Sequence, residues 1–433
     1  MNPKLWIGIV VFIMLGIGCE RITRPRLTES AEIELKALAG LVTEAYLRID
    51  VKQLPSNSVI KIYRNGALWL EGSYSALDSV LHDEGLTPGS SVVYRAEVEK
   101  AGEVIGRSDE VRIQLKPTTS HDVTWYIYEF ESIGGGGRFF DVAIVNKNDI
   151  WVVGEIYHGY DLVNALHWDG SGWEEIRIQT NACGGVDYPS IKCVNKLEDG
   201  TVIFGHEDAS ITFYKNRKYE NDCSYINEIG AGLWSMFVRD SDHIYIGANK
   251  GEISLFNGNK WKKLFSIPEL FIQTIWSSNN ENNISEVFAL ASDFYRHPGS
   301  WLIKIEGEEA SIIADSAEIP RGMAGLWFSS GKEYWLVGDG VLRSRLSPHN
   351  WQGFRDFPRY FSHAIAATDI NDVWVVGAYG LVSHYNGESW HHYGGRKLPP
   401  HGLLLSVAVT RDVIIAVGTK SSKGYIVMGQ RQN

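Results

Sequence analysis

The sequence predicts an all-β protein with two folded regions, a small β-sandwich followed by a larger ring of repeated sheets. Three observations lead to this fold: short alternating strands between turn signals, an internal repeat, and a composition rich in apolar and aromatic residues. Of the 433 residues, 44% are hydrophobic, 12% aromatic and only 21% charged. This composition excludes a disordered chain, a coiled coil and a multi-span membrane protein.

The net charge and the length of the chain indicate its type of partner and its number of domains. The chain carries 52 acidic and 41 basic residues, a net charge of -11. Because this is the wrong sign for following a phosphate backbone, we expect no nucleic-acid partner. The chain is about three times as long as a typical domain, so more than one domain is expected.

The N-terminus predicts export and lipid attachment. Lys4 precedes an apolar stretch over residues 5–18, which ends in small residues just before Cys19. The stretch is shorter than the roughly 20 residues that span a bilayer. It resembles the signal peptide and lipobox of bacterial lipoproteins, which implies removal of residues 1–18 and a lipid on Cys19. An uncleaved anchor and an ordinary secreted protein are the alternatives, and both also put the chain outside the cytoplasm. Glu20 stands where inner-membrane lipoproteins have Asp, which favours the outer membrane.

The first folded region is predicted over residues 31–118, after a polar tether over 19–30. Its apolar runs are short and bounded by turn residues, as in a sandwich, and they cover 45–51, 58–63, 92–98 and 111–115. Asn65 and Gly66 predict a type I′ hairpin turn, because both residue types tolerate positive φ angles.

The segment 86–89, Leu-Thr-Pro-Gly, followed by Tyr94, resembles the tyrosine corner of fibronectin type III domains. The resemblance implies that the Tyr94 hydroxyl bonds back to the main chain. It also implies a spacer that lifts the next domain off the membrane, with adhesion as the alternative role.

The rest of the chain contains an internal repeat. Residues 148–154 read Asn-Asp-Ile-Trp-Val-Val-Gly, and residues 371–377 repeat them with Val in place of Ile. Seven such runs end in a small residue at a mean spacing of 44 residues, at positions 154, 205, 248, 291, 338, 377 and 418. About four strands fit into one repeat, and four-stranded units at this period are typical of a β-propeller.

A hairpin and a missing strand complete this prediction. The clearest units have Asp-Gly or Asn-Gly followed three residues later by Trp, at 169–173, 257–261 and 386–390. The seventh unit has room for only one strand after its apolar run, so its fourth strand is missing. Residues 124–130 stand alone after the sandwich and are assigned to that place. The sequence therefore predicts a seven-bladed propeller over residues 122–433, closed by 124–130.

Residues 371–393 resemble the repeat of two-component regulator propellers, with Asp-x-Trp, a Gly turn and a Tyr-Asn-Gly hairpin before an aromatic residue. In that family the propellers lie outside the cell and sense ligands for a kinase. The sequence has no kinase motif, so the resemblance implies a binding or sensing role alone.

Patterns for catalysis and metal binding are weak. The Gly-x-x-Trp hairpins resemble the Asp-box of sialidases, but Asp169 stands one residue before Gly instead of two, so a turn is the better interpretation. Asp149 and Asp372 are interpreted as turn residues, because no calcium-type series of aspartates occurs. Four histidines are interpreted as solvated residues of outer strands: His384, His391, His392 and His401. We expect no catalytic residue, no metal and no cofactor.

The candidate binding residues lie in loops between second and third strands, which often form the ligand face of propellers. Aromatic and Arg side chains are the usual anchors of protein or glycan contacts. The candidates are Tyr157, His158, Tyr160, Phe294, Tyr295, Arg296, His297 and Tyr379.

Three cysteines follow Cys19, and an oxidising compartment permits one disulfide among them. Cys183 with Cys223 is the preferred pair. Cys193 falls in an apolar run that predicts a buried strand, where a lone Cys acts as a small hydrophobic residue.

We therefore predict a non-enzymatic, membrane-anchored, monomeric binding module of the bacterial cell envelope, whose partner is an envelope protein or a glycan. Two other classes stay open. A propeller hydrolase or lyase acting on surface polysaccharide would need two carboxylates about 5 to 9.5 Å apart. A structural envelope component would need no site at all, whereas a broad aromatic face without a deep polar pocket favours protein binding.

Overall fold

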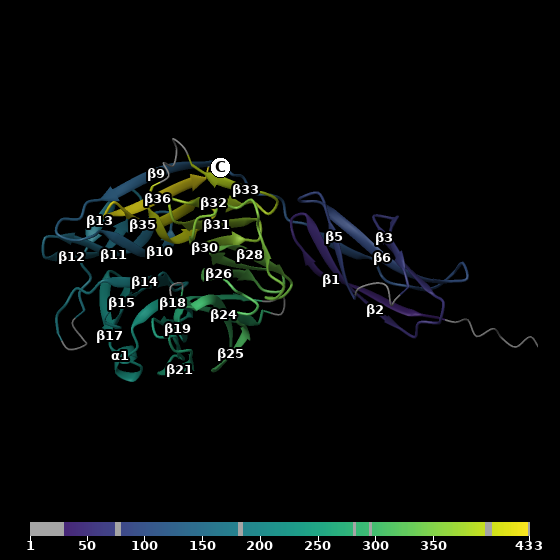
Figure 1. The fold of residues 1–433 in the computed structure, drawn as a ribbon, viewed down its shortest axis with the longest axis horizontal. Helices are drawn as coiled ribbons and strands as arrows, with labels where there is room; N and C mark the ends of the chain where they lie inside the picture. The colour runs from purple at the N-terminus through teal and green to yellow at the C-terminus, as the bar shows by residue number, and fades with distance from the viewer. Residues whose placement is uncertain are drawn as a thin grey trace, which may run out of the picture.

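The computed structural model describes residues 30–73, 79–180, 185–279, 283–293, 297–394 and 401–431. Figure 1 shows a smaller N-terminal body in purple and blue beside a larger body that runs through teal and green to yellow. Regular structure in the described residues is almost entirely β-strand, and the one helix among them is α1 (Ser224–Glu228). The predicted all-β class is confirmed.

The N-terminal body is a sandwich of two sheets. One sheet has the order β1-β2-β5, and the other has the order β4-β3-β6-β7, with β8 also paired to β6. Alternate side chains of both sheets point inward, and they form one apolar core that includes Leu47, Ile62 and Tyr94. The strands are β1 (Glu32–Gly40), β2 (Glu44–Lys52), β3 (Val59–Arg64), β4 (Ala67–Gly72), β5 (Val80–Glu84), β6 (Ser91–Lys100), β7 (Glu103–Arg107) and β8 (Val111–Gln114).

One detail of this body differs from the expectation. Asn65 and Gly66 join β3 to β4 with φ angles of 50° and 82°, as a type I′ turn requires. The Tyr94 hydroxyl, however, donates a 2.6 Å hydrogen bond to the Asp83 carboxylate and not to the main chain. Asp83 is buried and also accepts a hydrogen bond from Arg64 at 2.8 Å. The expected main-chain bond of Tyr94 was therefore wrong, because a buried carboxylate on β5 is the stronger acceptor beside it.

The C-terminal body contains seven four-stranded antiparallel sheets within the described residues. The repeated apolar run is the second strand of each of the seven sheets. Six of the sheets are each made of four consecutive strands. These strands are β10 (Arg138–Asn146), β11 (Asp149–His158), β12 (Asp161–Trp168), β13 (Trp173–Ile176), β14 (Ile191–Lys196), β15 (Val202–His206), β16 (Ile211–Lys215), β17 (Lys218–Asp222), β18 (Leu233–Asp240), β19 (His243–Ala248), β20 (Glu252–Phe256), β21 (Trp261–Ser266), β22 (Phe271–Asn279), β23 (Ser285–Asp293), β24 (His297–Glu306), β25 (Glu309–Ala314), β26 (Met323–Ser329), β27 (Glu333–Gly338), β28 (Gly340–Arg345), β29 (Gln352–Gly353), β30 (Ser362–Asp369), β31 (Asp372–Gly377), β32 (Val382–Tyr385) and β33 (Trp390–Tyr393).

The seventh sheet joins the two ends of this body. Its order is β34-β35-β36-β9, made of β34 (Leu403–Val409), β35 (Val413–Lys420), β36 (Lys423–Arg431) and β9 (Val123–Phe130). In Figure 1, β9 in blue lies along β36 in yellow, and the pairing runs from Val123 opposite Arg431 to Phe130 opposite Gly424. The first strands of neighbouring sheets contact one another in cyclic order, including β34 with β10, so the sheets form a closed ring.

The antiparallel order gives the ring two unlike ends. The turns between first and second strands and between third and fourth strands lie at one end, which we call the hairpin face. The loops between second and third strands and the connections between sheets lie at the other end, which we call the loop face. The chain enters the ring from the sandwich at the hairpin face, because β9 begins there beside the end of β36.

The sandwich is fixed to the hairpin face of the fifth and sixth sheets. Asn371 donates a 2.8 Å hydrogen bond to the main-chain oxygen of Pro117, and Lys116 forms an ion pair with Asp369. Apolar side chains of the sandwich, including Leu41 and Tyr46, share one core cluster with the fifth and sixth sheets. The loop face is therefore left uncovered by the sandwich.

A charged cluster lies inside this contact. Glu44 of β2 forms an ion pair with Arg345 and lies 3.8 Å from Arg343. It also accepts a 2.8 Å hydrogen bond from the Tyr46 hydroxyl. Burial opposes ionisation of Glu44, but the two guanidinium groups outweigh it and lower the pKa of its carboxyl. The cluster therefore links the two bodies by charge as well as by apolar packing.

The repeated Asp-x-Trp motif forms a triad of side chains. In the first sheet, Asp149 accepts hydrogen bonds from the Trp151 indole at 3.0 Å and from His167 at 2.9 Å, and the two rings stack 4.3 Å apart. The sixth sheet repeats the triad with Asp372, Trp374 and His384. The fifth sheet has an acid–Trp–Arg version, made of Glu333, Trp335 and Arg343. The two aspartates lie at the first hairpin of their sheets, as expected, and their side chains also hold the tryptophan and histidine side chains in place.

Candidate binding face

The loop-face end of each first strand carries a shift in register. In the first sheet, Phe139 pairs with Gly154 and Asp141 pairs with Val153, so Phe140 has no partner in β11. The same shift occurs near the start of the first strand in each of the seven sheets. Such a shift is a β-bulge, which bends the strand and re-aims one side chain.

In the first and seventh sheets, the glycine that ends the repeat lies close against the first strand. A Cβ on Gly154 would lie 2.1 Å from the main-chain oxygen of Arg138, and one on Gly418 would lie 1.9 Å from that of Leu403. Any side chain there would push the first strand away. Glycine therefore keeps the first strand close in these two sheets, whereas the third and fourth sheets have the same bulge beside Ala248 and Ala291.

The end of β11 and the loop that follows it carry three of the predicted residues. Tyr160 is fully exposed, and His158 Nε2 lies 2.8 Å from the Glu175 carboxylate. Tyr157 is half-buried, and its main-chain oxygen accepts a 2.6 Å hydrogen bond from the Ile133 N–H. The loop therefore packs on the connection that leads from β9 to β10.

Tyr379 lies in the corresponding loop of the sixth sheet. It is 67% exposed, with a φ angle of 57°, and its ring lies 5.1 Å from that of Tyr360. The next residue, Gly380, donates a 2.8 Å main-chain hydrogen bond to Gly402, in the connection before β34. Two exposed tyrosines thus stand together on the loop face.

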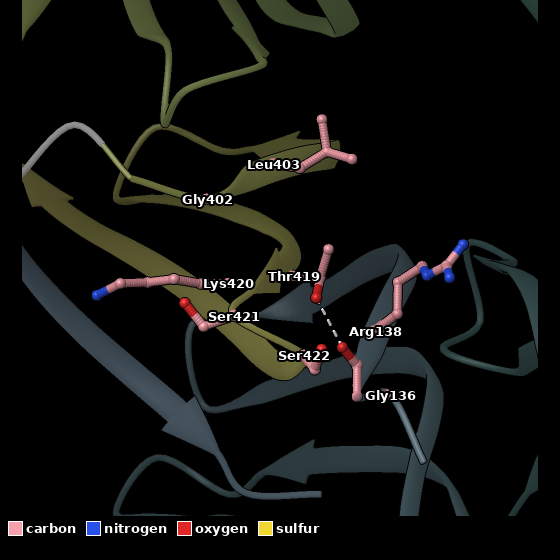
Figure 2. A pocket seen from close by; sticks show the side chains of 9 residues that line it. Gly136, Arg138, Gly402, Leu403, Thr419, Lys420, Ser421 and Ser422 are labelled. Carbon is pink, nitrogen blue, oxygen red and sulfur yellow. Dashed lines mark hydrogen bonds between the residues drawn. The ribbon is translucent and has the colours of Figure 1, made fainter.

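An open hollow of about 390 Å³ adjoins both loops. On one side its lining includes Gly137, in the connection that the Tyr157 loop packs against, and on the other it includes Gly402. Figure 2 shows Arg138 and Lys420 pointing away to opposite sides. The Thr419 hydroxyl donates a 2.7 Å hydrogen bond to the main-chain oxygen of Gly137. The complete lining is Gly136, Gly137, Arg138, Gly402, Leu403, Thr419, Lys420, Ser421 and Ser422, which contains no carboxylate.

The predicted residues of the fourth sheet are described only in part. Phe294, Tyr295 and Arg296 lie outside the described residues. His297 begins β24 and is paired in register with Asp293 of β23. The end of β23 and the start of β24 lie at the loop face, as the order of strands requires.

The cysteines behave differently from one another. Cys193 is a free, buried thiol on β14, and burial raises its pKa well above the ordinary value. Cys223 is disulfide-bonded. Cys183 and Cys19 lie outside the described residues, so the Cys183–Cys223 pairing stays a prediction.

The histidines correct one interpretation. His391 and His392 are exposed on the outer strand β33, but His384 is fully buried on β32. His384 was wrongly assigned to solvent, because the triad with Asp372 and Trp374 encloses it. Among the described residues, no three His, Cys, Asp or Glu side chains are placed to hold a metal ion.

Sequence reasoning missed the bulge residues themselves. They are Phe140, Lys192, Trp234, Gln273, Ala324, His363 and Leu405, one at each register shift. Aligning the first strands by the small residue of the following strand brings only Phe140, Trp234, Ala324 and His363 into one column, each 14 residues before that small residue. The alternation of apolar and polar residues gives no such signal, because the bulge interrupts it.

Comparisons with known proteins agree on the fold. No protein-family model matches the sequence, and the comparison with curated proteins finds no match. Solved structures do match. "YCF48 bound to D1 peptide" has a TM-score of 0.54 at 13% identity, over 73% of this chain and 99% of that one. The WD40 β-propeller domain of Doa1 has a TM-score of 0.54 at 11% identity, over 72% and 98%. Virginiamycin B lyase from Staphylococcus aureus, with quinupristin, has a TM-score of 0.50 at 13% identity, over 71% and 100%.

These similarities define the class of fold, a β-propeller, and the predicted propeller fold is confirmed. At such identities they show the fold alone. Within the described residues, no helix is long and apolar enough to cross a membrane.

Proposed function

We propose that this protein is a lipid-anchored binding module of the bacterial cell envelope, in which a seven-bladed propeller presents its loop face to a protein partner. The observation that carries the proposal is the loop face itself. Tyr160, Tyr360 and Tyr379 are exposed there, and an open hollow lies on the same face, at the end of the ring opposite the sandwich. Aromatic side chains on an open face are typical of protein-binding surfaces.

The architecture supports this role. Seven four-stranded sheets and a strand shared between the two ends are what a closed seven-bladed propeller requires. The sheet orders β1-β2-β5 and β4-β3-β6-β7 are those expected of a fibronectin type III domain. A domain fixed to the hairpin face would hold the loop face away from the membrane that Cys19 contacts.

Two observations favour a protein over a polysaccharide substrate. A solved structure with a similar fold is YCF48 bound to D1 peptide. The hollow on the loop face has no carboxylate in its lining, whereas glycoside hydrolysis normally needs two. A protein partner is therefore the first candidate, and a glycan is an outcome of the test.

The test uses the full chain purified in detergent, an extract of envelope proteins and a glycan array. One variant combines Tyr157→Ala, Tyr160→Ala and Tyr379→Ala. A matched control combines Tyr126→Ala and Tyr219→Ala, which remove tyrosines 43% and 42% exposed on the outer strands β9 and β17. Captured proteins are identified and their binding is remeasured in purified form.

The expected result is one envelope protein that binds the wild type and the control but binds the loop-face variant at least about tenfold more weakly. Equal binding by all three proteins would remove the loop face from consideration. Retention of a glycan in place of a protein would change the class of ligand.

Lipid attachment is tested separately. Cells that express the wild type or Cys19→Ser are grown with labelled palmitate. Their inner-membrane and outer-membrane fractions are then separated. We expect label and outer-membrane localisation for the wild type alone, since an acylated Cys is what holds such a protein to the bilayer. Label in the Cys19→Ser variant would contradict the assignment.

A further inference from the structure

The seven bulge residues lie at the same level of the ring, where the first strands reach the loop face. We call this set the central rim: Phe140, Lys192, Trp234, Gln273, Ala324, His363 and Leu405. First strands of neighbouring sheets contact one another around the ring. The rim therefore surrounds the centre of the loop face with one re-aimed side chain from each sheet.

The rim is chemically uneven. In the first and second sheets, the Lys192 ammonium lies 4.1 Å from the centre of the Phe140 ring, and the Arg138 guanidinium lies 5.5 Å from it. In the third sheet, Trp234 is 43% exposed and lies 5.2 Å from the Phe271 ring of the fourth sheet. Large aromatic and cationic groups thus occupy one half of the rim, whereas the fifth and seventh sheets contribute only aliphatic side chains, those of Ala324 and Leu405.

One cation of this half lacks a counterion. Lys192 lies 3.3 Å from the Glu207 carboxylate. Arg138 is exposed and, among the described residues, has no carboxylate within ion-pair distance. In a chain with a net charge of -11, an unpaired guanidinium against an aromatic ring is suited to bind a carboxylate brought by a partner.

The strands that carry the rim also present main-chain groups. Each first strand is the edge of its sheet, so one side of it is free of ladder partners inside that sheet. One such group is already used within the ring, since the Asp141 carboxylate accepts a 3.0 Å hydrogen bond from the Val194 N–H. Edge strands with side-chain pockets beside them bind extended peptides through the same kind of main-chain bond.

We propose that the aromatic half of the central rim binds an extended segment of the protein partner, which places an aromatic side chain against Trp234 and a carboxylate on Arg138. This proposal rests on the proposed function and adds the chemistry of the segment and its place on the loop face. The exposed indole supplies an apolar contact for a flat side chain, and the free guanidinium supplies a charge-assisted hydrogen bond.

The test uses three short fluorescent peptides with Gly-Ser flanks and centres of Glu-Trp-Glu, Gln-Trp-Gln and Glu-Ala-Glu. Binding to the full chain in detergent is measured by fluorescence anisotropy. We expect the Glu-Trp-Glu peptide to bind most tightly, and loss of either the carboxylates or the indole to weaken binding about tenfold.

Two variants locate each contact. Arg138→Gln should weaken binding of Glu-Trp-Glu about tenfold and leave Gln-Trp-Gln unchanged, because only the carboxylate contact is lost. Trp234→Leu, which keeps an apolar group beside Phe271, should weaken Glu-Trp-Glu and leave Glu-Ala-Glu unchanged. The controls are Lys147→Gln, at the hairpin-face end of β10, and Tyr126→Ala, whose exposure of 43% equals that of Trp234.

The outcomes that overturn the proposal are distinct from failure of the proposed function. If no peptide binds the folded wild type, or if Lys147→Gln weakens binding as much as Arg138→Gln, the rim does not bind such a segment. Capture of the envelope partner that depends on Tyr157, Tyr160 and Tyr379 would still support the proposed function, because none of these residues belongs to the rim. A glycan that is lost with Trp234→Leu would assign the rim to another ligand.

Discussion

The triads of the first and sixth sheets contain the same three residue types in the same geometry, yet their surroundings differ. In the first sheet, the Asp149 and His167 side chains are 37% and 22% exposed. In the sixth sheet, Asp372 and His384 are 3% and 0% exposed. Asp372 there also accepts two hydrogen bonds from Arg431, at 2.6 and 2.7 Å, near the end of β36.

The buried triad also holds the segment that connects the two bodies. His121 Nδ1 lies 2.9 Å from His384 Nδ1, and the main-chain oxygen of His121 accepts a 2.7 Å hydrogen bond from Tyr393. In the fifth sheet, the corresponding cation is Arg343, which lies beside Glu44 of the sandwich. The comparison shows that the exposed triad contacts only the neighbouring sheet, through Trp151 packing on Phe204 and Tyr214, whereas the buried triad also joins segments that are distant in the sequence.

The largest expected effect follows from removing the buried carboxylate. Asp372→Ala leaves Arg431 and His384 without their acceptor in a buried place, which should lower the free energy of unfolding by about 3–5 kcal/mol. Asp149→Ala, at the exposed copy, should cost about 1 kcal/mol. Urea unfolding of both variants measures the difference, and equal losses would mean that burial does not distinguish the two triads.

The charged contact between the two bodies should have the next largest effect. Glu44→Ala leaves Arg345 and Arg343 facing each other without a carboxylate, at a cost of about 2 kcal/mol. Protease cleavage between residues 115 and 122 should become faster as the sandwich loosens. The control is Glu34→Ala, whose pair with Lys36 is 58% and 54% exposed and should contribute nothing measurable. Unchanged cleavage in Glu44→Ala would show that apolar packing alone fixes the sandwich.

The buried triad should also respond to pH. Burial lowers the pKa of His384, and burial together with the nearby His384 and His391 lowers that of His121 to about 4. A histidine whose folded pKa is depressed stabilises the fold above its unfolded pKa of about 6.5, and this stability is lost as the pH falls toward the folded value. A second proton would also place two N–H donors against each other between the rings.

The free energy of unfolding is measured for the wild type and for His121→Asn between pH 7 and pH 5. We expect the wild type to lose more stability than the variant over this range, by about 1 kcal/mol or less, because His121 is still partly solvated. Asp141 acts in the opposite direction, since burial raises its pKa to about 6 and the folded state then gains stability as the pH falls. The difference in pH-dependent stability between the two proteins isolates the contribution of His121. Parallel curves of stability against pH would contradict this contribution.

The repeat made most of the larger body predictable from the sequence. Asn-Gly and Asp-Gly turns and the small residue that ends each apolar run depend on local conformation and close approach, and these signals recur along the repeat. The strand over 124–130 could be assigned because the last unit lacked its fourth strand, and in the structure β9 pairs with β36. Such features follow from the conformational preferences of single residues and from the number of strands in each repeat.

The triads and the rim could not be predicted in this way, because their partners are brought together only by the fold. Asp372 of the sixth sheet contacts Arg431 of the seventh, and Glu44 of the sandwich contacts Arg345 of the ring. The polar side chains of Asp372 and His384 favour a position in solvent, but in the interior each forms a hydrogen bond with the other. The rim residues were hidden for a different reason, since a one-residue bulge reverses the face on which the pattern places a side chain.

The smallest expected effect concerns the histidine of the exposed triad. His167→Gln can still donate one hydrogen bond toward Asp149 but loses the stacking on Trp151, whose ring lies 4.3 Å away. With water available to both side chains, the loss should be about 0.5 kcal/mol, whereas the same change at buried His384 should cost several times more. Urea unfolding at pH 7 measures both. A loss at His167 as large as that at His384 would mean that ring stacking on tryptophan, and not burial of the charged pair, stabilises this motif.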